Sequence, residues 1–231
     1  MEGSQQLAEW IRSGETRVLC GQRIFVHTAV TPGRPPLLLI HGYPTASYDW
    51  VRTWPRLAAT HSLYTLDLLG FGLSAKPRGS RYPIEGQADL CMALLEAFGV
   101  GKAHVLAHDY GDTVAQELLA RHAEGRLKLA SMVFLNGGLF PETHRARPIQ
   151  KLLATPVLGP LLARAMNYQK FAAAMLAISG RHPPSREELQ DLWLLAERNG
   201  GRLALARLIS YMAQRRRHRS RWVGALVESS V

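Results

Sequence analysis

The chain has 231 residues and 47% of them are hydrophobic, which suits a globular domain with a sizeable core and excludes a disordered segment. No apolar run is long enough to span a membrane and the polar start lacks a secretory signal pattern, so we expect a cytoplasmic protein. The formal net charge is +10, and the cations are densest in RRRHRSR at 215–221. No interleaved aromatics and no nucleic-acid motif accompany this run. We therefore interpret it as a solvated helix end rather than as a nucleic-acid or anionic-membrane patch.

The two cysteines give no sign of a metal site. Cys20 and Cys91 are far apart in the chain and lack metal-ligand spacing. We expect both to be small buried residues of a protein in a reducing compartment, and we expect no cofactor.

Hydrophobic patterning predicts strands and helices in alternation over the first 138 residues. In chain order we expect strands at 17–20, 23–27, 35–42, 61–70, 102–108 and 129–138, and helices at 47–59 (bent at Pro55), 84–98 and 113–122. Continuous apolar runs such as PPLLLIHG are typical of parallel strands that are covered on both faces. The pattern therefore predicts an α/β fold with a mostly parallel sheet between layers of helices.

The alternation stops after the last of these strands. From 139 to 221 we find only helical segments separated by prolines, so we expect a helical cap over the carboxyl ends of the strands. The predicted organisation is a core at 1–138, a cap at 139–221, and the start of a return to the core at 222–231.

Three turns should meet at the carboxyl ends of the strands: 41–44, 67–74 and 107–111. In the third turn Asp109 lies between Ala107 and Gly111, in the small–x–nucleophile–x–small arrangement of a strand-to-helix elbow. The outer residues must be small because the strand and the helix pass closely there. A simple helix N-cap would also favour aspartate, but it would not require this frame.

The stretches HGYPTASYDW, DLLGFGLSAKP, HDYGDTVAQELL and NGGLFPETHR resemble the α/β-hydrolase superfamily, in its branch of epoxide hydrolases and haloalkane dehalogenases. The resemblance implies that Asp109 is a nucleophile that opens an epoxide and forms a covalent ester. It also implies an oxyanion hole made by the backbone N–H groups of Tyr43 and Tyr110. His41, Gly42 and His108 would support this site.

The resemblance further implies a small apolar electrophile as substrate and a cap tyrosine that protonates the leaving oxygen. Tyr168 and Tyr211 are the candidates. Dehalogenases typically offer side-chain N–H donors to the halide where this chain has Tyr43 and Tyr110, so dehalogenation is a weaker alternative. Carboxylic-ester hydrolysis is also weaker, because aspartate attack on an ester would form an anhydride.

Two elements of the family pattern are not found in this sequence. A triad acid and an activating histidine normally follow two later strands, and Asn136, at an alternative position for the acid, is not an acid. The late histidines, His144 and His218, lie in the expected cap without the expected context. We therefore interpret the sequence as truncated, and expect at most one self-alkylation per chain. A non-catalytic protein that binds a ligand or partner remains an alternative.

Overall fold

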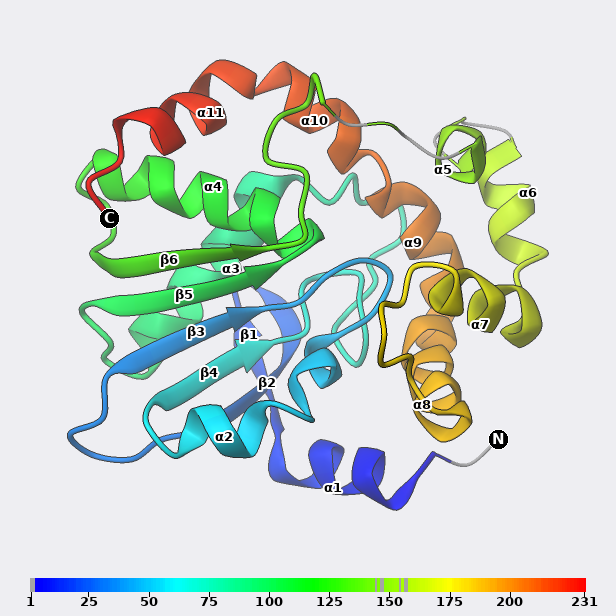
Figure 1. The fold of residues 1–231 in the computed structure, drawn as a ribbon, viewed down its shortest axis with the longest axis horizontal. Coiled ribbons are helices and arrows are strands. Elements are labelled where there is room, and N and C mark those ends of the chain that lie inside the picture. Colours follow the sequence, from blue (N-terminus) through cyan, green and yellow to red (C-terminus); the bar gives the residue numbers. More distant parts are fainter. Residues whose placement is uncertain (1–2, 144, 146–147, 154, 156–157) are drawn as a thin grey trace.

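The computed structural model describes residues 3–143, 145, 148–153, 155 and 158–231 (Figure 1). Its sheet has six strands in the order β1-β2-β4-β3-β5-β6. They are β1 (Glu15–Leu19), β2 (Gln22–Ala29), β3 (Pro36–Ile40), β4 (Ser62–Leu66), β5 (Ala103–His108) and β6 (Leu129–Leu135). β2 pairs antiparallel with β1 and β4, and the other pairs are parallel. The predicted mostly parallel α/β sheet is confirmed.

Alternating side chains of the strands build two cores, one on each face of the sheet. On one face, Leu38 and Ile40 pack with α3 (Ile84–Ala97) and α4 (Tyr110–Ala123). On the other, Leu37 and Leu39 pack with residues of α1 (Gln5–Ser13), η1 (Ser47–Trp50) and α8 (Arg186–Glu197). Both faces of the central strands are therefore covered, as their continuous apolar sequences predict.

Helices follow β6 throughout the rest of the described chain. They are α5 (Pro148–Leu153), α6 (Leu158–Arg164), α7 (Tyr168–Leu176), α8, η2 (Arg198–Gly200), α9 (Gly201–Leu208), α10 (Tyr211–Arg217) and α11 (Arg219–Glu228). The arrowheads of β3 to β6 point toward α7, α8 and α9, whereas α10 and α11 turn back over α4 (Figure 1). The sequence predicts a cap that ends at 221. This position falls inside α11, which continues to Glu228 and packs along α4.

Two predicted helices have different bounds. The helix expected at 47–59 is divided into η1 and α2 (Trp54–Ala58), with Pro55 in the first turn of α2. Proline lacks an N–H and fits the first turn of a helix better than its interior, which explains the division. The helix expected to begin at Thr113 begins at Tyr110.

Two expectations about burial were wrong. Cys91 is buried, but Cys20 is exposed in the β1–β2 turn, where its φ is +48°. The arginine-rich segment is not uniformly solvated: Arg215 is only 2% exposed and Arg221 pairs with buried Glu117. Hydropathy alone predicts that arginine faces water, whereas Arg215 is buried beside Gly138 and the 33% exposed side chain of Arg221 pairs with Glu117 of α4.

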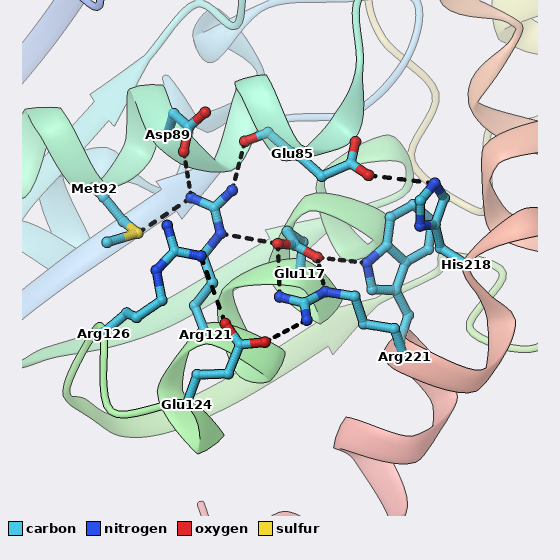
Figure 2. A network of polar contacts seen from close by, with 10 residues as sticks. Glu85, Asp89, Met92, Glu117, Arg121, Glu124, Arg126, His218 and Arg221 are labelled. Carbon is cyan, nitrogen blue, oxygen red and sulfur yellow. Dashed lines mark hydrogen bonds and ion pairs between the residues drawn. The ribbon is translucent and has the colours of Figure 1, made fainter.

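Arg221 belongs to a polar network that joins α11 to α4 (Figure 2). Glu117 Oε2 accepts hydrogen bonds from Arg221 Nε and from Trp222 Nε1, both at 2.7 Å. Glu117 Oε1 accepts from Arg121 Nε at 2.9 Å, and Arg121 also reaches Asp89 on α3 at 2.6 Å. The network therefore holds α4 between α3 and α11, and α4 is the helix that begins beside the candidate site.

Candidate functional site

Asp109 forms the whole connection between β5 and α4. β5 ends at His108, α4 begins at Tyr110, and Asp109 has φ +51° and ψ −109°, an uncommon conformation for a residue other than glycine. A Cβ on Gly111 would lie 2.6 Å from the Ile40 carbonyl oxygen. A small residue is therefore needed at Gly111 because the start of α4 approaches the backbone of β3, rather than that of β5, too closely for a side chain.

The loop after β3 lies against Asp109. The backbone N–H of Tyr43 donates to Asp109 Oδ1 at 2.9 Å. A Cβ on Gly42 would lie 2.9 Å from both Asp109 Cβ and His108 Nδ1, so glycine is needed for this approach. The loop and the elbow therefore fit together through one small residue and one hydrogen bond.

His41 supports this loop through contacts of both its ring nitrogens with the backbone. It is fully buried, Nδ1 lies 2.8 Å from the Gly42 carbonyl oxygen, and Nε2 accepts from the Leu68 N–H at 3.0 Å. Burial lowers the pKa of His41, which favours the neutral ring that this pair of hydrogen bonds requires. Both ring nitrogens are thus engaged in holding backbone, and the ring packs on Phe71 at 4.9 Å.

A cavity of about 490 Å³ extends from Asp109 under the helices that follow β6. Tyr43, Pro44, Asp109 and Asn136 line it from the sheet side. The opposite walls are largely apolar and include Leu153, Ala163, Met166, Phe171, Ala174, Met175, Ala177, Ile178, Trp193, Leu205 and Ala206. Gln150, Arg202 and Tyr211 add polar groups to these walls. The arrangement places one carboxylate at the end of a largely apolar chamber whose wall also contains a cation.

Of the two candidate tyrosines, Tyr211 lines the cavity and Tyr168 is not among its lining residues. The Tyr211 ring lies 5.0 Å from the Tyr110 ring, and its own surface is 5% exposed. Burial, and then the charge of Asp109, raise the pKa of Tyr211, so the phenol keeps its proton. Tyr168 donates to the Arg186 carbonyl oxygen at 3.4 Å, at the junction of α7 and α8.

No histidine lines this cavity in the part of the chain that the structure describes. His218 lies at the contact of α11 with α3, 3.3 Å from a Glu85 carboxylate oxygen and stacked on Trp222. His144 falls outside the described residues. The structure therefore brings Asp109, Tyr43, Tyr110 and Tyr211 together and leaves His218 elsewhere.

Two charged residues that were not candidates for this site, Asp112 and Arg215, lie near Asp109. Asp112 is 1% exposed and its Oδ1 accepts from the Leu135 N–H at 3.3 Å. Burial raises the pKa of Asp112 to about 7. A Cβ on Gly137 would lie 2.1 Å from Asp112 Oδ2, and one on Gly138 would lie 2.6 Å from Arg215 Nη2. The glycine pair after Asn136 is a local signal of these two inward side chains.

A third acid, Asp49, also lies close to the site. It accepts a hydrogen bond from Thr45 Oγ1, and burial followed by the charges of Asp109 and Asp67 raises its pKa to about 7. Asp109 is therefore not the only carboxyl group here, but it is the one that lines the cavity.

The described residues contain no group of three or more histidine, cysteine, aspartate or glutamate side chains placed to hold a metal ion. None of the described helices combines the length and the hydropathy needed to cross a bilayer.

Residues 35–184 match the α/β-hydrolase fold family, and the chain belongs to it. The chain is 43% identical over 238 residues to the mesoderm-specific transcript homolog protein of Bos taurus, covering 99% of this chain and 71% of that protein. Among solved structures it resembles haloalkane dehalogenase DbeA from Bradyrhizobium elkani, with a TM-score of 0.75 and 24% identity over 93% of this chain and 75% of that one. It also resembles the epoxide hydrolase CorEH, with a TM-score of 0.73 and 20% identity over 85% and 72% of the two chains. The family resemblance inferred from the sequence is confirmed.

Proposed function

We propose that the chain carries the nucleophilic half of an epoxide hydrolase site, in which Asp109 forms a covalent ester with the substrate. One observation carries the proposal: Asp109 lies at an elbow, at the end of an apolar cavity, with Oδ1 bound by the Tyr43 N–H. A carboxylate can attack an electrophilic carbon without a base to activate it. The positive end of the α4 dipole favours the carboxylate charge.

In the proposed first step, Asp109 Oδ2 attacks an epoxide carbon and the ring C–O bond breaks. The electron pair of that bond stays on the oxygen, and the resulting alkoxide takes a proton from the Tyr211 hydroxyl. The buried position of Tyr211 supports this role, since a phenol that keeps its proton in the resting site can donate it once a stronger base forms beside it.

In the proposed second step, water adds to the Asp109 carboxyl carbon of the ester. Oδ1 then becomes the oxyanion, and the Tyr43 N–H already points at this atom. The backbone N–H of Tyr110, at the first residue of α4, would be the second donor. Water in this step needs a general base, worth roughly 10²–10⁴-fold. The base takes one proton of the water, and the bond between the carboxyl carbon and Oδ2 then breaks. The diol leaves with Oδ2 and that proton, and the second water proton returns to the Tyr211 phenolate, which restores the Asp109 carboxylate.

The apolar lining favours a small apolar electrophile as substrate. Dehalogenation is less well supported, since Tyr43 and Tyr110 offer no side-chain N–H to a leaving halide. Carboxylic-ester hydrolysis would require attack by Asp109 to form an anhydride, and remains the weakest of the three.

A second candidate is a protein that binds an apolar ligand without turnover. The lack of a histidine among the described cavity residues favours it. In that case the cavity would hold the ligand, and Asp109 would position the loop after β3 by accepting the hydrogen bond from Tyr43.

Intact-mass measurement with styrene oxide separates the two candidates. We expect a single adduct that is lost in Asp109→Asn and kept in Asp89→Asn, whose aspartate is on α3, in the network of Figure 2, and does not line the cavity. We also expect no sustained release of the diol. An adduct that persists in Asp109→Asn would refute Asp109 as nucleophile, and bound epoxide without any adduct would favour the binding protein.

A further inference from the structure

The helices that roof the cavity expose an unusual number of large apolar side chains. Five are between 42% and 55% exposed: Leu152, Leu158, Leu161, Leu176 and Ile178. We call this set the cap apolar face. Single exposed leucines are common on proteins, but several exposed apolar side chains on and just after helices that line one cavity are typical of a surface that contacts something.

The spacing within these helices shows that the exposure is organised. In α6, Leu158 and Leu161 are three residues apart and share the outward side, whereas Gly159 and Ala163 are buried. In α7, Phe171 is buried against Trp193 and Leu176 is exposed. The helices α5 and α6 form the outer edge of the molecule, beyond α9 as seen from the sheet (Figure 1). A partner could therefore reach these side chains without rearrangement of the fold.

The helices that carry the cap apolar face are basic. The sequence has no aspartate or glutamate between Glu142 and Glu187. Over the same stretch Lys151, Arg164 and Lys170 are exposed on the very helices that carry the leucines. An apolar surface on helices that carry cations and no acids fits a partner that is apolar inside and anionic at its surface.

We propose that the cap apolar face docks on the surface of an anionic lipid bilayer. Short helices with leucines on one side and lysine or arginine beside them are held at the headgroup boundary by apolar burial and by attraction to anionic lipids. A second copy of this chain is a poorer partner, since two such faces would bring their cations together. Nucleic acid is also poorer, because it offers nothing to cover five large apolar side chains.

This position would give the cavity a lipid-facing entrance. Ala174, Ala177 and Ile178 line the cavity and are also exposed, so its mouth lies at the edge of the cap apolar face. An apolar ligand dissolved in the leaflet that the chain contacts could enter without crossing water. The docking itself does not depend on the chemistry proposed for Asp109.

Sedimentation with phosphatidylcholine vesicles, with and without phosphatidylserine, tests the proposal. We expect the chain to bind the mixed vesicles, and Leu158→Ser with Leu161→Ser to weaken binding about tenfold or more. Lys151→Glu with Lys170→Glu, or added salt, should also weaken it. The matched controls are Val18→Ser, whose valine is 72% exposed on β1, and Lys102→Glu, at the amino end of β5.

Circular dichroism of each variant separates loss of docking from loss of fold. Three results would overturn the proposal. They are failure of the folded chain to bind either vesicle, equal binding by the leucine and control variants, and light scattering that shows a dimer abolished by Leu158→Ser with Leu161→Ser.

Discussion

Replacing Glu117 by glutamine should destabilise the fold more than any other single charge removal discussed here. Burial alone would raise the pKa of Glu117, but hydrogen bonds from Arg221, Trp222 and Arg121 outweigh it and lower the pKa from 4.5 to about 2. The difference corresponds to about 3 kcal/mol of the free energy of unfolding. Glu117→Gln keeps the shape of the side chain, removes the charge, and leaves the buried Arg121 guanidinium with Asp89 as its remaining anionic partner.

The sign of the pH dependence follows from the lowered pKa. The folded chain holds Glu117 ionised more readily than the unfolded chain does, so its contribution is complete above pH 4.5 and is lost as the pH falls through about 2. Urea denaturation followed by circular dichroism should therefore show a loss of about 3 kcal/mol in Glu117→Gln at neutral pH, shrinking in acid.

The control for this prediction is Glu124→Gln. Glu124 pairs with the same Arg221 and with Arg126, but at the surface, where such pairs contribute little. The reasoning would be refuted if Glu117→Gln lost no more stability than Glu124→Gln, or if its loss were independent of pH.

Two further predictions concern residues near the elbow. Gly111→Ala should lower the free energy of unfolding by about 1–3 kcal/mol, because its Cβ would meet the backbone of β3. In thermal denaturation, the matched Gly224→Ala in α11, where a Cβ meets nothing within 4 Å, should instead raise stability by about 0.5–1 kcal/mol. For Asp112 the pKa is raised from 3.8 to about 7, so the unfolded chain loses its proton first and stability falls as the pH rises between these values. Asp112→Asn should match the native chain in acid and exceed it by up to about 4 kcal/mol above neutral pH; a less stable variant there would contradict this.

Much of the fold could be predicted because its signals are local. The buried strands β3 and β5 are continuous apolar runs, and α3 is amphipathic and ends before Gly99, whose φ of +66° suits glycine at a helix end. The frame around Asp109 is recognisable from neighbouring residues, although the contact that requires glycine at position 111 is with Ile40 on β3. Such features need only neighbouring residues to be read.

The features that could not be predicted depend on partners far along the chain. Glu117 and Trp222 are 105 residues apart, and nothing near either residue indicates that they meet. The same holds for Arg215, whose burial beside Gly138 reverses the solvated position expected for an arginine-rich run. Tyr168 and Tyr211 were equal candidates in the sequence, and only the path of α10 toward Tyr110 distinguishes them.

The candidate site and the ion network meet in α4, and this links reactivity to stability. A residue such as Asp109, with φ of +51°, holds an uncommon backbone conformation at a cost of about 1–3 kcal/mol, which persists only where the surroundings fix it. Gly111 fixes the start of α4 against β3, and Glu117 fixes it two turns later against α11. The helix cannot slide to relax Asp109 without breaking one of these contacts. The contact of Glu117 with Arg221 therefore helps to hold α4 in place from outside the cavity. As a result the Tyr43 N–H stays 2.9 Å from Asp109 Oδ1. Oδ1 is the atom on which negative charge would develop during ester hydrolysis.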